Sequence, residues 1–485
     1  MVNVRKLREG VREATDSLDQ AAGQPNRLPG FTYVPPSHAR ALDPQATLVE
    51  GIRGAGKSFW WAQLASSTHR AFIQSAYPEA RFDAGIKVAR GFGTGLSIKE
   101  APSPDVLAQL VEQNYRPRAI WRAVLAHHAG FSGEFAQLDR WSDRADWVQN
   151  HAEDFDELLD QADRTLDQRG ETLLILFDAL DRLADNWEHI NPLAKALLQV
   201  ALDARSTKRI RFKVFLRPDM LQDHAIIGFP DFSKLSVHKA SLAWRRSDLY
   251  ALFFQCLANT QEGGDDFRAL AGDTCGAALL KKSEYWVLPS ALRSDEADQE
   301  LAFKALAGSA MGNSPKRGKP YTWLVNHLQD GLNQVSPRSF FSALKTAAEE
   351  TRDDYDLALD YRAIQIGVQK ASQIRVQEIT SEDYPWVDLV MSPLYGKLTV
   401  PCEVEAFRQI WKEQKTLDTL KEQLQKKQGI VKLPPQNLED GARGVLRDLE
   451  ALGLIQTMPD QRIQMPDVYR IAFGFGRKGG VKPLK

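Results

Sequence analysis

The sequence is poor in the features that mark secreted, zinc-binding or membrane-spanning proteins. Its three cysteines, Cys256, Cys275 and Cys402, form no Cys-x-x-Cys pair, which excludes a disulfide framework and leaves no zinc signature. No run of about 18 apolar residues occurs, and the N-terminus lacks the apolar stretch of a signal peptide. The formal net charge of −1 creates no overall preference for nucleic acid or membranes. We therefore expect a cytoplasmic protein with no membrane partner.

One glycine-rich stretch, residues 51–58, fits the phosphate-binding pattern G-x-x-x-x-G-K-[ST]. Its glycines let backbone N–H groups point at phosphate oxygens, its lysine places a cation between the β- and γ-phosphates, and its serine hydroxyl is a Mg²⁺ ligand. A strand pattern precedes it and a helix pattern follows, which is the required order; the alternative is a glycine-rich turn that carries Lys-Ser by chance. We expect an ATP and Mg²⁺ site formed by Gly51, Arg53, Gly54, Ala55, Gly56, Lys57, Ser58 and Phe59.

A second stretch predicts the acidic side of this site. Residues 173–177 are all apolar and end at Asp178, as expected for a buried strand whose tip delivers a carboxylate. We expect Asp178 to hold Mg²⁺ opposite Ser58. Motor ATPases usually carry a glutamate at the next position, which is Ala179 here, and the next acid is Asp181. Asp181 is predicted to position water or support the metal, with a helix N-cap as the alternative.

Another apolar strand pattern, residues 211–216, ends at Arg217. If this strand lies beside the one that ends at Asp178, its guanidinium can reach a γ-phosphate and sense its presence. The alternative is a surface arginine in an ordinary β-turn.

Residues 174–182, with the pattern of four apolar residues and D-x-x-D-R, resemble the STAND ATPases and the related KAP-like P-loop ATPases of the AAA+-like branch. Arg217 and the tryptophan-containing helix pattern at 242–250 contribute to the resemblance, which covers about residues 38–350. It implies a protein that uses ATP to switch its own oligomerisation or a partner. The chain departs from the family at Leu216 and Arg217, where a Thr-Ser-Arg ending is more usual.

The same resemblance suggests a second arginine. Ser336 is a natural N-cap and Pro337 suits the first helical position, so Arg338 projects from the first turn of a lid helix. In AAA+-like proteins an arginine so placed reaches the nucleotide. The alternative is an Arg338 that pairs with a carboxylate in a helical bundle.

The C-terminal part predicts a winged helix. A helix pattern over 437–452 is closed by Gly453 as its C′ residue, and two short strand patterns around a turn at 459–461 follow. Residues 401–485 carry more Lys and Arg than Asp and Glu, and everything after Asp467 is free of acids, so we expect a basic tail there.

DNA is a possible partner of this winged helix. Arg443 and Arg447 can face a DNA groove, but Asp440, Asp448 and Glu450 lie on the same helix and are expected to repel phosphate. Winged helices in ATPases often contact protein instead, and that alternative stays open.

These patterns predict an α/β P-loop NTPase fold of the ASCE, AAA+-like type, with a parallel sheet core, a helical lid and a C-terminal winged helix. We expect an N-terminal helix and a lead-in, of which the lead-in packs across the nucleotide domain (1–36), the ATPase core (37–240), a helical lid and connector (241–390) and the winged-helix domain (391–485).

The leading functional hypothesis is a STAND-like switch that slowly hydrolyses ATP to control its own homo-oligomer or a separate effector protein. The chain contains no nuclease, protease or deaminase constellation, so in a setting such as phage defence any damaging activity belongs to another chain. The alternative is a DNA-associated AAA+-like ATPase, a loader or remodeller that binds DNA through the winged helix. A small-molecule kinase is less favoured, because P-loop kinases seldom carry a lid and a winged helix.

Overall fold

The computed structural model describes residues 2–16, 24–80, 82, 85–184, 187–276, 278–282, 284–425, 433–478 and 481–483. The chain divides into two compact units. Residues Asp19–Ala243 form the sheet unit, and Met1–Leu18 together with Trp244–Lys485 form the helical unit. No helix among the described residues is long and apolar enough to cross a membrane.

The sheet unit is built on a five-stranded parallel sheet in the order β2-β3-β4-β1-β5. The strands are β1 (Leu48–Glu50), β2 (Ile86–Phe92), β3 (Thr172–Phe177), β4 (Ile210–Leu216) and β5 (Ala240–Ser241). Strand β4 lies between β1 and β3, with Glu50 opposite Leu216 and Phe177 opposite Val214. The carboxyl ends of β1, β3 and β4 therefore meet at one edge, the usual ligand-binding edge of an open parallel sheet.

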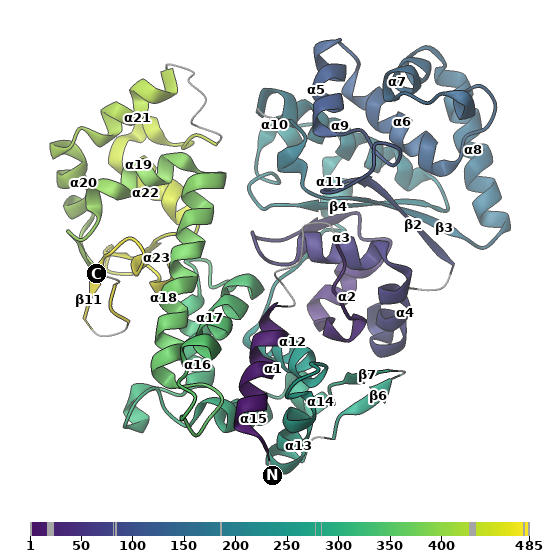
Figure 1. The fold of residues 1–485 in the computed structure, drawn as a ribbon. Helices are drawn as coiled ribbons and strands as arrows, with labels where there is room; N and C mark the ends of the chain where they lie inside the picture. Colours follow the sequence, from purple (N-terminus) through teal and green to yellow (C-terminus); the bar gives the residue numbers. More distant parts are fainter. Residues whose placement is uncertain are drawn as a thin grey trace. The chain divides into compact units, whose positions relative to one another are not determined.

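Helices cover both faces of this sheet (Figure 1). One face carries α3 (Lys57–Ala65), and the other carries α6 (Pro117–Ala129), α8 (Ala152–Gln168) and α9 (Trp187–Asp203). The remaining helices of the unit are α2 (Pro36–Leu42), α4 (Ser67–Ala76), α5 (Pro104–Glu112), α7 (Trp141–Asn150), α10 (His224–Ile227) and α11 (Phe232–Ser236).

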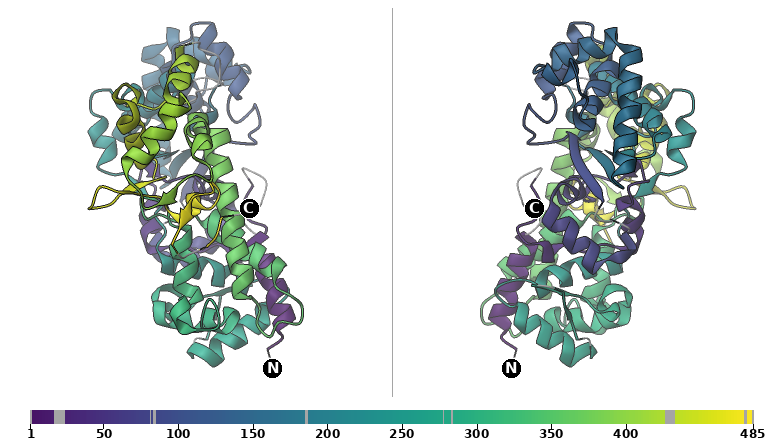
Figure 2. Two further views of the ribbon diagram at one scale, coloured as in Figure 1. Left: turned by 90° about the vertical axis from the view of Figure 1, so that its left-hand side faces the viewer. Right: turned by 90° about the vertical axis from the view of Figure 1, so that its right-hand side faces the viewer.

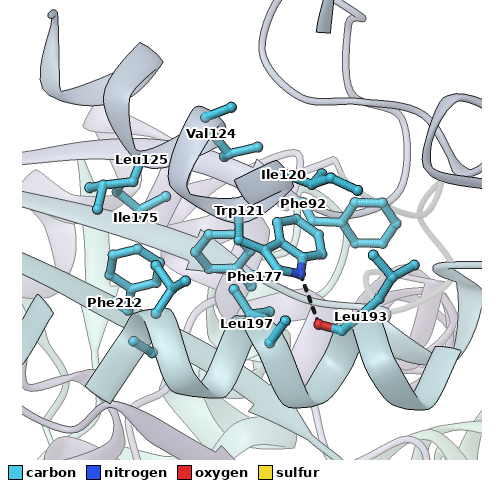
Figure 3. Packing of buried hydrophobic residues seen from close by; sticks show 14 of the residues in the cluster. Phe92, Ile120, Trp121, Val124, Leu125, Ile175, Phe177, Leu193, Leu197 and Phe212 are labelled. Atoms are coloured by element: carbon cyan, nitrogen blue, oxygen red, sulfur yellow. Dashed lines mark hydrogen bonds between the residues drawn. The ribbon is translucent and has the colours of Figure 1, made fainter. Parts of the chain in front are cut away.

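An aromatic cluster fixes the end of β3. Figure 3 shows the Trp121 ring edge-on to Phe177, with ring centroids 5.7 Å apart, and Phe177 stacks on Phe212 of β4 at 5.2 Å. The indole N–H of Trp121 donates to the carbonyl oxygen of Leu193 in α9 at 2.8 Å. Because Phe177 is the residue before Asp178, this packing holds the strand tip that carries the carboxylate.

A buried lysine ties β4 to the segment around α2. The Lys213 ammonium is fully buried and donates to the carbonyl oxygens of Ala41 at 2.6 Å, Asp43 at 2.9 Å and Ala46 at 2.9 Å. Each of its three N–H groups therefore has a hydrogen-bond acceptor. The lead-in to the P-loop strand is thereby fixed against the sheet.

The helical unit contains both chain ends. Helix α1 (Val4–Asp16) packs against α12 (Arg246–Ala258) and α17 (Pro337–Glu350) through its buried face of Leu7, Val11 and Ala14. Buried Arg8 donates to the carbonyl oxygens of Tyr355, Leu357 and Ala358. Helix α1 therefore uses its apolar face within the helical unit, whereas the lead-in from residue 24 onward belongs to the sheet unit.

The lid part of this unit also contains α13 (Gly264–Cys275), α14 (Ser290–Ser294), α15 (Glu296–Ala307), α16 (Pro320–Leu328) and the hairpin of β6 (Leu280–Lys282) and β7 (Tyr285–Val287). Helix α18 (Tyr361–Gln377) packs on α16 and α17 and also on α23 (Asp467–Arg470), so one helix is shared by the lid and the C-terminal part. Helix α19 (Pro385–Met391) follows it.

The C-terminal part is a winged helix, as predicted. It contains α20 (Val404–Glu413), α21 (Thr416–Gln425), α22 (Gly441–Ala451) and the antiparallel hairpin of β9 (Gln456–Thr457) and β10 (Ile463–Gln464), and Cys402 forms an isolated antiparallel β-bridge with Ile463. Gly453 closes α22 with φ of +73°, the left-handed conformation expected of a C′ glycine.

The basic segment after Asp467 is bonded into the helical unit. Arg470 is fully buried and donates to the Asp467 carboxylate and to the carbonyl oxygens of Phe475 and Val481. Strand β11 (Gly476–Arg477) pairs in parallel with β8 (Thr399–Val400). Figures 1 and 2 show this yellow segment against α18, where Gln369 donates to the carbonyl oxygen of Lys482.

We predict that Lys213→Met destabilises the sheet unit by roughly 3 kcal/mol or more, because three buried carbonyl groups lose their shared donor. Urea unfolding of the purified chain measures the loss. Lys208→Met is the matched control, since that lysine side chain is 77% exposed, and it should change stability by less than about 0.5 kcal/mol. Equal midpoints for the two variants would contradict the structural role of Lys213.

Candidate nucleotide site and winged-helix surface

The P-loop connects β1 to α3 at the carboxyl edge of the sheet. Gly54 and Gly56 adopt φ angles of +75° and +101°, which glycine reaches without strain. A Cβ on Gly51 would lie 3.2 Å from Ala55 Cβ, so this position is also crowded. The Lys57 ammonium donates to the carbonyl oxygens of Gly51 at 2.8 Å and Ile52 at 3.1 Å. The loop thus folds around its own lysine.

The other predicted loop residues lie where the motif requires them. Ala55 is buried, and its N–H donates to the carbonyl oxygen of Ile52 at 3.1 Å. Arg53 lies in the loop, and Phe59 lies in the first turn of α3, edge-on to the Trp60 ring with centroids 5.0 Å apart. Roles for these three residues in nucleotide binding stay predictions.

Ser58 and Asp178 meet, as the sequence predicted. Asp178 is 3% exposed, and its N–H donates to the carbonyl oxygen of Phe92 at 3.0 Å. The Ser58 hydroxyl lies near enough to this carboxylate to lower its pKa. Burial raises the pKa of Asp178, while the Ser58 hydroxyl and the Lys57 ammonium act in the opposite direction. A serine hydroxyl from the first turn of α3 and a carboxylate from the end of β3 thus lie at the same place in the site.

This pair of oxygen donors fits Mg²⁺, a hard cation that keeps several waters and binds proteins through one or two side chains plus substrate phosphates. The described residues contain no cluster of three or more His, Cys, Asp or Glu side chains able to hold a metal by themselves. The donor set therefore suits a cation shared with a nucleotide, and Ser58 and Asp178 are the residues that would hold it.

Asp181 lies in a short 3₁₀ turn, Leu180–Arg182, that follows the strand tip. Ala179 begins this turn with φ of +55°, an unusual angle for a residue other than glycine. The Asp181 carboxylate lies 3.5 Å from the Arg217 guanidinium. Its described partner is thus an arginine of the site, and no described hydrogen bond makes Asp181 a helix cap.

Arg217 is 8% exposed, which rules out the surface-turn alternative. Its Nε and one terminal nitrogen contact the Asp219 carboxylate at 3.2 Å and 2.9 Å, and the other terminal nitrogen faces Asp181. Sequence reasoning gave no role to Asp219. A carboxylate two residues after a strand-terminal arginine, with a proline between them, was the available signal.

The charges of the site act on one another. Burial lowers the pKa of Lys57 to about 8; Asp178, Asp181 and Asp219 raise it, and Arg217 lowers it further. The two cations and three carboxylates therefore gather at one end of the sheet, although they come from three separate parts of the sequence.

Arg338 lies in the first turn of α17, as predicted, and forms an ion pair with Glu378 at 2.7 Å. The pairing with a carboxylate that we considered as an alternative is therefore present. A contact between Arg338 and a nucleotide stays a prediction.

On the winged helix, Arg443 and Arg447 are exposed on α22. Arg447 pairs with Asp440. Asp448, in contrast, is 8% exposed and accepts from the backbone N–H and the side-chain amide of Asn437 at 2.9 Å and 2.6 Å. The expectation that Asp448 repels phosphate is wrong, because its carboxylate is used inside the domain.

Glu450 is the last of the three acids that we expected to oppose DNA. Its carboxylate accepts from the backbone N–H of Thr457 at 2.7 Å and from the Thr457 hydroxyl at 3.1 Å. It therefore ties α22 to the first strand of the wing. Asp440 stays exposed directly before α22, where it pairs with Arg447. Within α22 itself, Arg443 and Arg447 are the exposed charged residues.

We predict that ATP affinity falls as the pH rises above 8. Lys57 has a pKa of about 8 before nucleotide binds, and phosphate oxygens favour its protonated form. Above that pH binding must take up a proton, so affinity should fall by up to about tenfold per pH unit. Isothermal titration at pH 7.5 and 9.5, in buffers with different ionisation enthalpies, measures affinity and proton uptake. Constant affinity without proton uptake would contradict this role of Lys57.

No family model matches the chain, and no curated protein matches it in sequence. Solved structures that are similar include the ORC2 protein of Aeropyrum pernix in ADPNP–ADP complexes, at 14% identity over 91% of this chain and 93% of that chain, with a TM-score of 0.40. The ORC1 protein of Aeropyrum pernix in complex with DNA is 13% identical over 89% and 86%, with a TM-score of 0.32. Cdc6p of Pyrobaculum aerophilum is 11% identical over 91% and 93%, with a TM-score of 0.30.

TM-scores this low carry no functional argument, and a STAND or KAP-like assignment stays a prediction. The strand order, P-loop and hairpin-bearing C-terminal domain of the chain itself define the fold: an AAA+-like α/β P-loop core with a helical lid and a C-terminal winged helix.

Proposed function

We propose that this chain is a DNA-associated ATPase, which binds Mg·ATP at its P-loop and duplex DNA through the exposed face of α22. The observation that carries the proposal is the contact between the Ser58 hydroxyl and the buried Asp178 carboxylate beside Lys57. It brings together a cation for phosphate and two oxygen donors for a divalent ion.

Each side chain of the site has a distinct task. Lys57 neutralises the β- and γ-phosphates, while Ser58 and Asp178 hold the cation that accompanies them. That cation, when bound, offsets the charge that develops on the phosphates. Arg217 is the guanidinium in reach of a terminal phosphate. Because Ala179 has no carboxylate, Asp181 is the acid of that turn available to orient water, and we expect slow turnover.

The DNA part of the proposal follows from how the acids of α22 are used. Asp448 is turned inward and Glu450 is bonded to the wing. Exposed Arg443 and Arg447 lie four positions apart and so share one face of the helix. One such face of a winged helix can enter a major groove, and arginine is the side chain that most often contacts phosphate and guanine there.

The switch hypothesis ranks second. The sequence favours it because acids interleaved on α22 oppose DNA binding. That argument does not apply to Asp448, whose carboxylate is buried. Slow hydrolysis at a site without a glutamate after Asp178 is still compatible with a switch that controls a homo-oligomer. A separate effector protein and a role in phage defence have no support among the described residues.

Lys57→Ala is predicted to abolish tight Mg·ATP binding, because it removes the cation that neutralises the phosphates. Asp178→Asn should retain part of the binding and lose Mg²⁺-dependent turnover. Isothermal titration and phosphate release measure the two effects, and Lys208→Ala, on the exposed loop before β4, is the matched control. Wild-type ATP affinity in a folded Lys57→Ala protein would end the P-loop assignment.

Replacing both Arg443 and Arg447 by Ala is predicted to weaken duplex DNA binding and to flatten the slope of log K against log salt by roughly one unit per lost phosphate contact. Fluorescence anisotropy over a salt series measures both quantities. Lys304→Ala, an exposed lysine on lid helix α15, should leave the slope unchanged. Weak DNA binding by the unmodified chain, combined with an ATP-dependent change of oligomer in light scattering, would favour the switch.

A further inference from the structure

We infer that Asp219 is a positioning residue, which holds the Arg217 guanidinium toward the nucleotide site and thereby sets the preference for ATP over ADP. The inference rests on the proposed function, because it assumes that Arg217 meets the terminal phosphate. It adds a residue for which the sequence suggested no role.

The geometry of the pair is the first support. Asp219 contacts Nε and one terminal nitrogen of Arg217 at 3.2 Å and 2.9 Å, so it occupies a whole edge of the guanidinium. Two-point contacts of this kind fix orientation as well as charge. The remaining terminal nitrogen is 3.5 Å from Asp181, on the turn that follows Asp178. Asp219 therefore determines which end of the guanidinium faces the acids of the site.

The position of Arg217 in the sheet is the second support. It follows Leu216, the last residue of β4, whose carbonyl oxygen accepts from the N–H of Gly51 at 3.1 Å. The backbone before Arg217 is thus bonded to the first residue of the P-loop. Arg217 thus has its backbone beside the P-loop and its guanidinium beside the turn that carries Asp181.

Burial is the third support. With Arg217 only 8% exposed, its charge must be paired inside the protein. Asp219 supplies that partner from two residues along the chain, and Pro218 between them restricts the backbone. The shorter Asp219 contacts, compared with 3.5 Å to Asp181, mark Asp219 as the firmer partner. The end near Asp181 is then the one that can turn to a phosphate.

The turn after β4 does not depend on the Asp219 side chain. The Asp219 carbonyl oxygen accepts from the N–H groups of Gln222 and Asp223, each at 3.1 Å. Substitution of the carboxylate leaves these backbone bonds in place. Asp219→Asn is therefore a clean probe of the contact with Arg217.

The experiment measures dissociation constants for Mg·ATP and Mg·ADP by isothermal titration. Asp219→Asn should reduce the preference for ATP over ADP by about tenfold and leave ADP affinity within about twofold of wild type, because ADP has no γ-phosphate for Arg217 to contact. Asp219→Glu, which keeps the charge, should restore part of the preference. Asp223→Asn is the matched control: it caps α10 through the N–H of Ala225 and should leave the preference unchanged.

A double-mutant cycle separates positioning from a general structural role. In an Arg217→Ala background, Asp219→Asn should cause no further loss of preference, because the residue through which it acts is gone. An undiminished loss in that background, or a wild-type preference in Asp219→Asn alone, would overturn the inference.

Two further outcomes are informative. If Asp219→Asn fails to fold, Arg217→Ala is compared with the double variant Arg217→Ala/Asp219→Ala, in which both members of the buried pair are removed. An equal preference for ATP over ADP in the two variants supports the inference. A further loss of that preference in the double variant overturns it. If the unmodified chain does not bind Mg·ATP, the proposed function itself fails. That failure is distinct from one in which ATP binds normally and Asp219 has no effect.

Discussion

The parallel pairing of β4 with both β1 and β3 is the constraint on which the site depends. Gly51, Asp178 and Arg217 each follow the last residue of one of these strands. Because all three strands run in the same direction and end within two residues of one another in the ladder, these residues meet at one edge although more than a hundred positions separate Gly51 from Asp178. The aromatic packing of Phe177 against Trp121 and Phe212 keeps that edge fixed.

Burial then decides how the charges of the site are arranged. A buried ion costs several kcal/mol unless it is paired, so each cation has a defined partner. The Lys57 ammonium lies against two loop carbonyl oxygens, and Arg217 lies against Asp219 and Asp181. The Asp178 carboxylate lies beside the Ser58 hydroxyl and the Lys57 ammonium, and both lower its pKa. This network connects the residues to which we assign phosphate binding, metal binding and phosphate sensing, so that a change in one partner alters the orientation available to the next.

In the helical unit, hydrogen bonds to backbone carbonyl oxygens join the lid to the winged helix. The N–H of Gly331 donates to the carbonyl oxygen of Gly453 at 2.6 Å, and the Gln456 side chain donates to the carbonyl oxygen of Gly331 at 2.8 Å. A Cβ on Gly331 would lie 2.7 Å from the Gly453 oxygen, so only glycine fits this close approach. With α18 shared by both parts, the winged helix is built into the unit, and motions of the lid would carry it along.

The sequence by itself determined the features that depend on neighbouring residues: the P-loop between a strand and a helix, the carboxylate at the tip of an apolar strand, and the C′ glycine and hairpin of the winged helix. It also placed Arg217 at a strand end. Only the tertiary structure decided that Asp219 holds this arginine, that Asp448 turns inward and that Arg470 is buried beneath the C-terminal segment. The physical reason is that glycine dihedrals and apolar periodicity act over a few residues, whereas the partner and burial of a charge depend on which distant segments the fold brings around it.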